Sequence, residues 1–191
     1  MFKEYRWLFM SYEYMTREQL IVELEKKDKI IENIARCAGT DSLTSVLNRK
    51  RGLESLYREI ELAKINKEKL TIGFADVNNL KNINDNYGHL TGDYVLITLC
   101  NIIKDNIRKS DFIFRYGGDE FIIVLPKTNI KESSIVWNRI SDKIKETSKN
   151  LKYEIGMSCG FVEYDEYYNK SLKELIKMAD FKMYESKSKI G

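Results

Sequence analysis

The stretch that decides the fold is Phe112-Ile113-Phe114-Arg115-Tyr116-Gly117-Gly118-Asp119-Glu120-Phe121-Ile122-Ile123-Val124-Leu125. Aromatic and β-branched residues, which favour strands, stand on both sides of a glycine pair. This pattern predicts a β-hairpin with a tight turn, because glycine takes positive φ without strain. Asp119 and Glu120 then open the second strand. Carboxylates beside a backbone that carries no side chains are suited to hold Mg²⁺ next to a phosphate. An ordinary acidic hairpin is the alternative.

The composition indicates one globular domain with an appendage. Of the 191 residues, 43% are hydrophobic and 32% are charged, which fits a soluble folded chain. The net charge of +3 is too small to favour a polymeric nucleic acid as partner. We expect no membrane span, because no apolar run reaches about 18 residues. The 3 cysteines form no C-x-x-C pair, which predicts reduced thiols and a cytoplasmic protein.

Residues 1–40 are expected to form a separate signalling or dimerisation region. Residues 1–15 are rich in aromatic side chains and fit a remnant of an upstream sensor, a docking segment or a packed helix. Thr16-Arg17-Glu18-Gln19 is typical of a capping box and predicts a charged helix to about Ala38, ended by Gly39. The helix fits either a dimerising stalk or a helix lying on its own domain. Its short heptad-like stripe consists of Leu20, Leu24, Ile31, Ile34 and Ala38.

Residues 41–191 alternate between helical and strand-like segments. Helices are predicted from Arg49 to about Asn66 and over residues 92–107, 131–149 and 172–187. Strands are predicted over residues 70–75, in the hairpin, and over 153–164, where Gly156 and Gly160 would be irregularities. This order favours an α/β (α+β) fold with a mixed central sheet flanked by helices.

Two acids stand at the ends of different predicted strands. Asp76 directly follows the apolar run 70–75, and Asp119 belongs to the hairpin. Alone, each would be a helix cap or a surface charge. Brought together, the two could chelate one or two Mg²⁺ ions, as nucleotidyl transfer requires.

Several motifs in register resemble the GGDEF family of diguanylate cyclases. Arg-Tyr-Gly-Gly-Asp-Glu-Phe at 115–121 resembles the family signature, and the segment from Asp41 to Arg49 resembles the family's Asp-x-Leu-Thr-x-Leu-x-Asn-Arg. The resemblance covers about residues 41–190. It implies that residues 41–191 form a GGDEF catalytic domain with the ferredoxin-like palm of nucleotidyl cyclases.

The resemblance also implies a set of metal ligands. Asp76, the backbone carbonyl of Val77, Asp119 and Glu120 would hold Mg²⁺ or Mn²⁺, with two ions in each active site. Asp119 is expected to act as the base for the 3′-hydroxyl of GTP, and Glu120 to support the metal.

The GTP contacts implied by the family come from three segments. Asn84 and Asp93 match the pair that reads the guanine edge, and a carboxylate at 93 suits the adjacent N1–H and N2–H donors of guanine. His89, the only histidine, matches a nucleotide contact or else is a packing residue. Lys81 is expected to offset charge developing on the phosphates. The residues expected to surround those phosphates are Asn79, Leu80, Lys81, Gly117, Gly118 and Lys187.

The chain departs from the family pattern at a few positions. Asn78 stands where the family often has a second aspartate, and Leu80 where it often has phenylalanine. Asp119 occupies a position where glutamate is also common. The usual Arg-Asn after the last helix has no counterpart up to Gly191, so a phosphate-binding arginine is expected to be either absent or replaced by Lys189.

A control site is implied by Arg108-Lys109-Ser110-Asp111, at the offset of the family's R-x-x-D product-inhibition site. Arginine forks suit guanine and phosphate, so this site is expected to bind cyclic di-GMP. Arg139 is a candidate second contact from the next helix.

The sequence therefore predicts a diguanylate cyclase that condenses two GTP into cyclic di-GMP and two pyrophosphates as a homodimer. One alternative is an inactive receptor that binds cyclic di-GMP through Arg108 and Asp111. The other is a related palm enzyme that makes a different nucleotide.

Overall fold

The computed structural model describes residues 15–164 and 171–187, without the side chains of residues 29 and 31–38. The chain divides into two compact units, Met1–Gly39 and Thr40–Gly191. Most of residues 1–15 therefore lies outside the described residues, as does Lys189. Among the described residues, no helix is both long enough and apolar enough to cross a membrane.

The described part of the first unit is helix α2, Arg17–Gly39. Its capping box is confirmed, because the Thr16 amide donates to Gln19 Oε1 at 2.9 Å and the Gln19 amide donates to Thr16 Oγ1 at 3.3 Å. Several apolar side chains of α2 are exposed within this unit. They are Ile21, Val22, Leu24 and Ile30. Of the predicted stripe, only the side chains of Leu20 and Leu24 are described.

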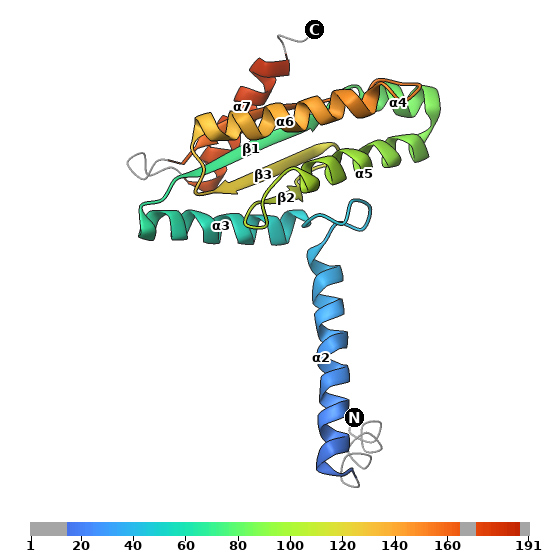
Figure 1. The fold of residues 1–191 in the computed structure, drawn as a ribbon, viewed down its shortest axis with the longest axis vertical. Coiled ribbons are helices and arrows are strands. Elements are labelled where there is room, and N and C mark those ends of the chain that lie inside the picture. Colours follow the sequence, from blue (N-terminus) through green and yellow to red (C-terminus); the bar gives the residue numbers. More distant parts are fainter. Residues whose placement is uncertain (1–14, 165–170, 188–191) are drawn as a thin grey trace, which may run out of the picture. The chain divides into compact units, whose positions relative to one another are not determined.

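The second unit is built on a four-stranded sheet with the order β2-β3-β1-β4 (Figure 1). Its strands are β1 Leu70–Val77, β2 Phe112–Arg115, β3 Glu120–Pro126 and β4 Met157–Glu163. All three strand pairings are antiparallel, so the sheet itself is not mixed. An isolated parallel bridge joins Leu47 to Phe114. The predicted hairpin is confirmed as β2–β3, and the strand order is that of a ferredoxin-like palm.

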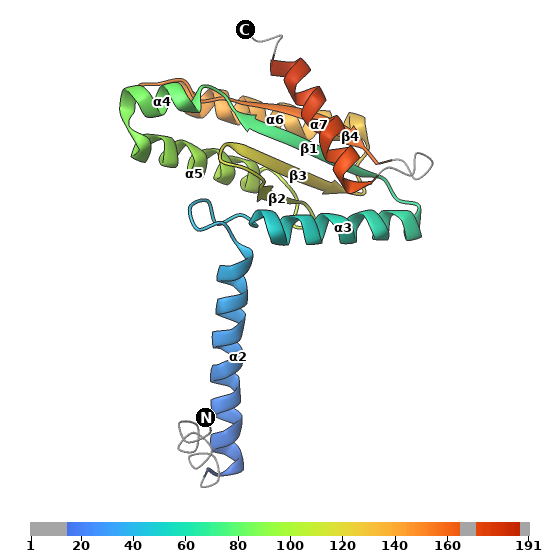
Figure 2. The same cartoon turned by 180° about the vertical axis from the view of Figure 1, so that it is seen from behind.

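Helices cover both faces of the sheet (Figure 2). Helices α3, Arg49–Asn66, and α7, Leu172–Lys187, pack on the face that carries Ile72, Phe74 and Ile122. Helices α5, His89–Asp105, and α6, Ile130–Ser148, pack on the face of Ala75, Phe121 and Ile123. Strand β1 is buried on both faces because it lies in the middle of these layers, which explains its continuous apolar run.

The structure corrects several predicted boundaries. A short helix, α4 Leu80–Tyr87, fills a segment for which no helix was predicted. Helix α5 begins at His89 instead of residue 92, and β4 begins at Met157 instead of residue 153. Gly160 is not an irregularity, since it pairs with Phe74 in the regular ladder. A Cβ at Gly160 would lie 2.0 Å from the Met183 amide nitrogen, so glycine is needed there for the close approach of α7.

Candidate active site

The two predicted acid segments meet at one end of the sheet. Asp76 in β1 and Glu120 in β3 are directly paired across the antiparallel ladder. Asp76 stands two residues after Phe74 and Glu120 two residues before Ile122, so by strand alternation both carboxylates lie on the face covered by α3 and α7. Asp119 precedes β3, and its carbonyl oxygen accepts a hydrogen bond from the Val77 amide at 3.1 Å. The fold thus brings together all four predicted metal-binding residues.

The glycine pair has a different purpose from the one predicted. Neither Gly117 nor Gly118 has positive φ, so the turn does not require glycine for its backbone conformation. A Cβ at Gly117 would instead lie 2.2 Å from Glu120 Oε2, so a larger residue there would require the Glu120 carboxylate to move. A Cβ at Gly118 would meet no atom within 4 Å, which leaves the outer side of the turn open to a ligand.

A charged clamp holds the hairpin turn. Arg115 donates from Nε and Nη2 to the Gly118 carbonyl oxygen, at 3.1 and 2.7 Å. Its Nη1 donates to both carboxylate oxygens of Asp41, at 3.0 and 3.2 Å. Asp41 also accepts from the amide and hydroxyl of Thr44, at 2.9 and 2.7 Å. Although burial raises the pKa of Asp41, the hydrogen bonds from Thr44 and Arg115 lower it below its usual value.

Sequence reasoning missed this clamp, although its two partners stood in the two recognised motifs. Asp41 and Arg115 are 74 positions apart, and nothing in a single sequence pairs them. A second link joins the same motifs, since the Arg49 guanidinium lies 4.2 Å from the centre of the Tyr116 ring. Tyr116 in turn packs edge-on against Phe74, with ring centres 5.6 Å apart. The turn is therefore held from the N-terminal side of α3 as well as by its own strands.

The segment after β1 presents free backbone donors. Asn79 has left-handed φ and ψ of 55° and 21° and caps α4 without a side-chain hydrogen bond. The amides at the first turn of a helix have no partner within that helix, so those of Leu80 and Lys81 are available to an anion. The turn is anchored by Asn78, whose amide donates to the Gly156 carbonyl at 2.9 Å and whose Oδ1 accepts from Ser158 Oγ at 2.9 Å. Asparagine at 78 thus has a structural role here.

Helices α4 and α5 carry the residues expected to read the base. Asn84 is half-buried, and its Oδ1 is the single buried side-chain oxygen or nitrogen among the described residues without a hydrogen-bond partner. Gly92 makes room for it, because a Cβ there would lie 1.9 Å from that oxygen. Asp93 is the next residue and is also half-buried, whereas His89 is exposed at the start of α5. An unpaired polar group of this kind is compensated when a ligand supplies the missing partner.

The end of α7 closes the acid site. Lys187 Nζ lies 2.5 Å from Asp76 Oδ1 and forms an ion pair with it. Burial raises the pKa of Glu120, and the nearby carboxylates of Asp119, Asp76 and Asp180 raise it further. The site therefore holds more negative charge than the chain itself compensates.

This excess of negative charge fits a divalent cation. No three side chains of the His, Cys, Asp or Glu types are grouped to hold a metal within the part of the chain that the structure describes. Mg²⁺ does not require three such side chains, because it commonly binds through one or two carboxylates plus substrate phosphates and keeps several waters. Asp76, Asp119 and Glu120 supply such carboxylates, and the lysine on Asp76 marks where a cation is favoured.

The predicted control site forms a compact turn between α5 and β2. The Arg108 amide donates to Asp111 Oδ2 at 2.9 Å, and the Asp111 amide donates to the Arg108 carbonyl at 3.0 Å. Asp111 is buried and Arg108 is exposed. The Arg139 guanidinium from α6 donates to the carbonyl of Asn106, so it lies beside the same turn. The three predicted residues are thus neighbours.

Comparisons with known proteins agree with this geometry. The family "Diguanylate cyclase, GGDEF domain" matches residues 38–190. The chain is 34% identical over 178 residues to diguanylate cyclase DosC of Escherichia coli K12, covering 90% of this chain and 37% of that protein. It is 38% identical over 138 residues to diguanylate cyclase A of Treponema denticola, covering 71% of this chain and 37% of the relative. The chain therefore spans well under half the length of these curated relatives.

A solved structure is similar over most of both chains. It is the coiled coil and GGDEF domain of DgcB from Caulobacter crescentus in complex with c-di-GMP, with a TM-score of 0.81 and 26% identity. The match covers 88% of this chain and 91% of the other. With a matching family model over residues 38–190, the fold of a ferredoxin-like palm and an acid site built from its signature, the chain belongs to the GGDEF family of diguanylate cyclases.

Proposed function

We propose that the chain is an active, Mg²⁺-dependent diguanylate cyclase that condenses two GTP into cyclic di-GMP. The observation that carries the proposal is the acid site, in which Asp76 and Glu120 face each other across β1 and β3 beside Asp119. A protein that only bound the product would have no need of this concentration of carboxylates. The family and its named relatives support the same reaction.

The reaction forms two phosphodiester bonds. The 3′-hydroxyl of one GTP attacks the α-phosphorus of the other, a new P–O bond forms, and the bond to the β-phosphate breaks to release pyrophosphate. A second identical step closes the ring and releases the second pyrophosphate. A bound divalent metal would supply neutralisation of the phosphates and activation of the attacking hydroxyl.

The residues of this chain have separate roles in that scheme. Asp119 would take the proton from the 3′-hydroxyl, and it would hold two metal ions together with Asp76, Glu120 and the Val77 carbonyl. The amides at the start of α4 and at Gly118 would face the phosphates, and Gly117, whose amide donates to the Glu120 carbonyl at 3.2 Å, would lie beside them. Lys81 offsets their growing negative charge.

Substrate choice is proposed to depend on α4 and α5. Asp93 would accept from N1–H and N2–H of guanine but would repel the N1 acceptor of adenine. Asn84 would supply the second base contact, and His89 would lie at the rim of the nucleotide site. Lys187 would exchange its ion pair with Asp76 for a phosphate contact when the metal–nucleotide complex enters.

Two copies of the domain are needed, because each holds one GTP and each 3′-hydroxyl must reach the opposite α-phosphate. Residues 1–40, with the exposed apolar side chains of α2, are proposed to promote this homodimer and to relay a signal from an upstream sensor. Cyclic di-GMP is proposed to inhibit the enzyme by binding Arg108, Asp111 and Arg139. GTP as substrate and reduced thiols favour a cytoplasmic site of action.

One experiment separates this function from its alternatives. The purified chain is incubated with Mg²⁺ and GTP, ATP or both, and the products are identified by mass spectrometry. We expect cyclic di-GMP from GTP, and no cyclic product from ATP alone. Tight cyclic di-GMP binding without any product would instead identify an inactive receptor, and a product containing adenine would identify a different palm enzyme.

Two variants link the reaction to the residues. Asp119→Ala should abolish product formation while circular dichroism and the unfolding midpoint stay close to those of the parent; unchanged turnover would refute the metal and base assignment. Arg108→Ala should raise the cyclic di-GMP concentration needed for half-inhibition. An unaltered inhibition curve would exclude the control site.

A further inference from the structure

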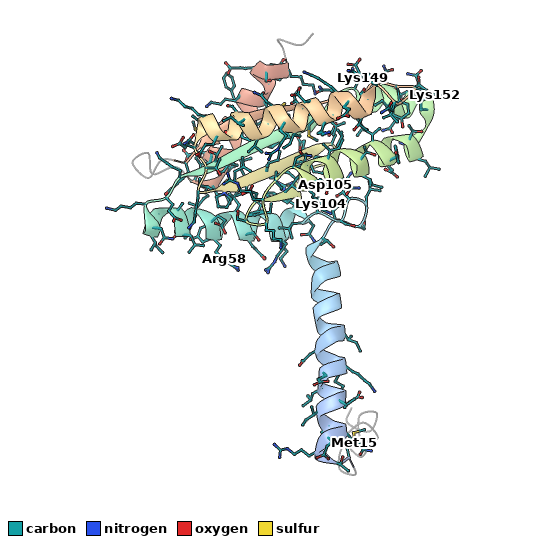
Figure 3. All side chains as sticks on the ribbon, viewed as in Figure 1. Met15, Arg58, Lys104, Asp105, Lys149 and Lys152 are labelled. Atoms are coloured by element: carbon teal, nitrogen blue, oxygen red, sulfur yellow. The ribbon has the colours of Figure 1, made fainter. Side chains whose placement is uncertain are left out.

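An open surface cavity lies at the C-terminal end of α6 and in the residues that follow it, none of which the proposed function uses. Its volume is about 530 Å³, within the range of small-molecule sites. Figure 3 labels two of its lysines, Lys149 and Lys152, at the end of the domain where α4 lies. The cavity is lined by Lys145, Ser148, Lys149, Leu151, Lys152, Tyr153, Glu154 and Ile155.

The cavity wall carries an excess of positive charge. Lys145, Lys149 and Lys152 are exposed at its rim, and among the described residues none forms an ion pair within 4.0 Å, although Lys149 is near enough to Glu146 to help lower the pKa of that carboxyl. Glu154 is the single acid of the lining. Lysines in the last turn of a helix often serve only to offset the helix dipole, which would explain Lys145. It does not explain Lys152, which stands beyond the end of α6 and faces the same cavity.

The rest of the lining combines apolar and aromatic side chains with one hydroxyl group. Ile155 is buried, and Leu151 and Tyr153 are half-buried. The Tyr153 ring is fixed by the ring of Tyr87, with centres 5.1 Å apart. The Ser148 Oγ accepts from the Ile155 amide at 3.0 Å, which leaves its hydroxyl hydrogen free to be donated to a ligand. Ammonium groups together with a hydroxyl donor suit phosphate oxygens.

The segment that lines the cavity contacts both ends of residues 78–87, which contain α4 and part of the proposed GTP site. The Tyr87 hydroxyl, at the end of α4, lies 3.4 Å from the Lys152 carbonyl oxygen. The Gly156 carbonyl, one residue beyond the cavity lining, accepts from the Asn78 amide at 2.9 Å. A ligand that orders residues 148–155 would therefore also bias the position of residues 78–87, which carry Lys81 and Asn84.

We propose that this cavity binds a small phosphate-bearing anion at a site separate from the proposed GTP site, and that its occupancy is coupled to the α4 segment. Pyrophosphate, inorganic phosphate and the phosphate groups of a nucleotide share the chemistry that the lysines recognise. The site is also separate from the control turn, which is formed by Arg108, Asp111 and Arg139.

The test uses the full chain labelled with ¹⁵N, in metal-free buffer of low ionic strength, titrated with inorganic pyrophosphate. Amide shifts are followed in heteronuclear correlation spectra, which separate the cavity from the proposed GTP site by residue. We expect saturable shifts at Ser148, Tyr153 and Ile155, with shifts of the Asn78 amide that share the same midpoint. Inorganic phosphate and GMP are titrated next, and their midpoints rank the sources of the phosphate group.

The variant removes the three charges together as Lys145→Gln, Lys149→Gln and Lys152→Gln, since glutamine preserves both the stem and the helix propensity. Its matched control carries Lys64→Gln, Lys131→Gln and Lys173→Gln, three exposed helical lysines remote from the cavity lining. We expect the pyrophosphate concentration at the midpoint of the shifts of residues 148–155 to rise about tenfold or more in the first variant. It should stay unchanged in the control, because charge-assisted hydrogen bonds dominate such sites.

Shifts confined to residues 78–93 and 117–120, or an equal loss in both variants, would overturn the proposal. The coupling is tested in a Lys81→Ala variant, which weakens pyrophosphate binding at the proposed GTP site. Amide shifts at the cavity residues without a shift of the Asn78 amide in that variant would overturn the coupling. Because binding is read without turnover, the failure of this proposal is distinct from the failure of the proposed cyclase activity.

Discussion

The clamp between Arg115 and Asp41 makes a prediction that joins stability to activity. Arg115→Ala removes two hydrogen bonds to the Gly118 carbonyl and two to the Asp41 carboxylate. It also leaves the Asp41 carboxylate without its cation in a site where only 19% of that side chain is exposed. The change therefore acts on the turn that carries Asp119 and on the segment that precedes α3.

The expected loss of stability follows from how deeply the Arg115–Asp41 pair is buried. Truncating one partner of a fully buried ion pair costs about 3–5 kcal/mol, and exposed pairs contribute about 0–1 kcal/mol. The clamp side chains are 18% and 19% exposed, which is closer to the buried limit. We expect Arg115→Ala to lower the free energy of unfolding by about 2–3 kcal/mol. A turn displaced by about 1 Å should also lower kcat by about 100-fold.

The assay combines urea unfolding with product formation. A double-mutant cycle of Arg115→Ala and Asp41→Ala measures the coupling between the two side chains, which we expect to be about 1–2 kcal/mol. The matched control is the pair Lys127 and Glu68, whose side chains are 70% and 33% exposed and whose coupling should fall below about 1 kcal/mol.

A coupling energy for the clamp no larger than that of the surface pair would refute the reasoning. So would an Arg115→Ala variant that is destabilised as expected but retains the parent kcat, because the turn would then not depend on the clamp for its catalytic position. Arg115→Lys adds a further comparison. Lysine keeps the charge but loses the planar fork, so it should recover stability only in part.

Three further predictions come from single positions. Because the folded pKa of Asp41 lies below its unfolded value, the stability advantage of the parent over Asp41→Asn should be constant at neutral pH and shrink as the pH falls below about 4, measured by urea unfolding at a series of pH values. Gly117→Ala should displace the Glu120 carboxylate and lower turnover at least about tenfold, whereas Gly118→Ala should keep the urea midpoint of the parent because its Cβ meets no protein atom; unchanged turnover in Gly117→Ala would contradict the packing seen at the turn. Gly160→Ala should push α7 away from β4 and destabilise the domain by about 1–3 kcal/mol, and an unchanged urea midpoint would show that the helix tolerates the extra methyl group.

Much of the architecture could be predicted because it depends on local patterns. The hairpin, the buried run of β1 and the capping box at Thr16 were each readable from neighbouring residues, and each is confirmed. Helix α4 was not predicted, since its eight residues include few apolar side chains and only Ile83 is buried. Its helical form depends on packing against α5, which a short polar segment does not reveal.

The reasons for particular residues were harder to predict than the residues themselves. At Gly117 and Gly92 the side chains of Glu120 and Asn84 occupy the space of a Cβ, and at Gly160 the backbone of α7 does. None of them has the positive φ that sequence reasoning assigns to turn glycines. Steric exclusion by a group that only the folded chain brings close leaves no mark in the sequence, whereas backbone preference does.

The sequence by itself determined the family motifs, the acids at 76, 119 and 120, and the alternation that builds the sheet, because these depend on residue type and spacing. Only the tertiary structure decided that Asp76 pairs with Glu120 across the ladder and that Lys187 forms an ion pair with Asp76. It also decided that Arg115 binds Asp41, which is 74 positions away in the sequence. Strand register and long-range ion pairs are set by how the layers pack together. Such packing is a property of the whole chain and not of any one stretch of it.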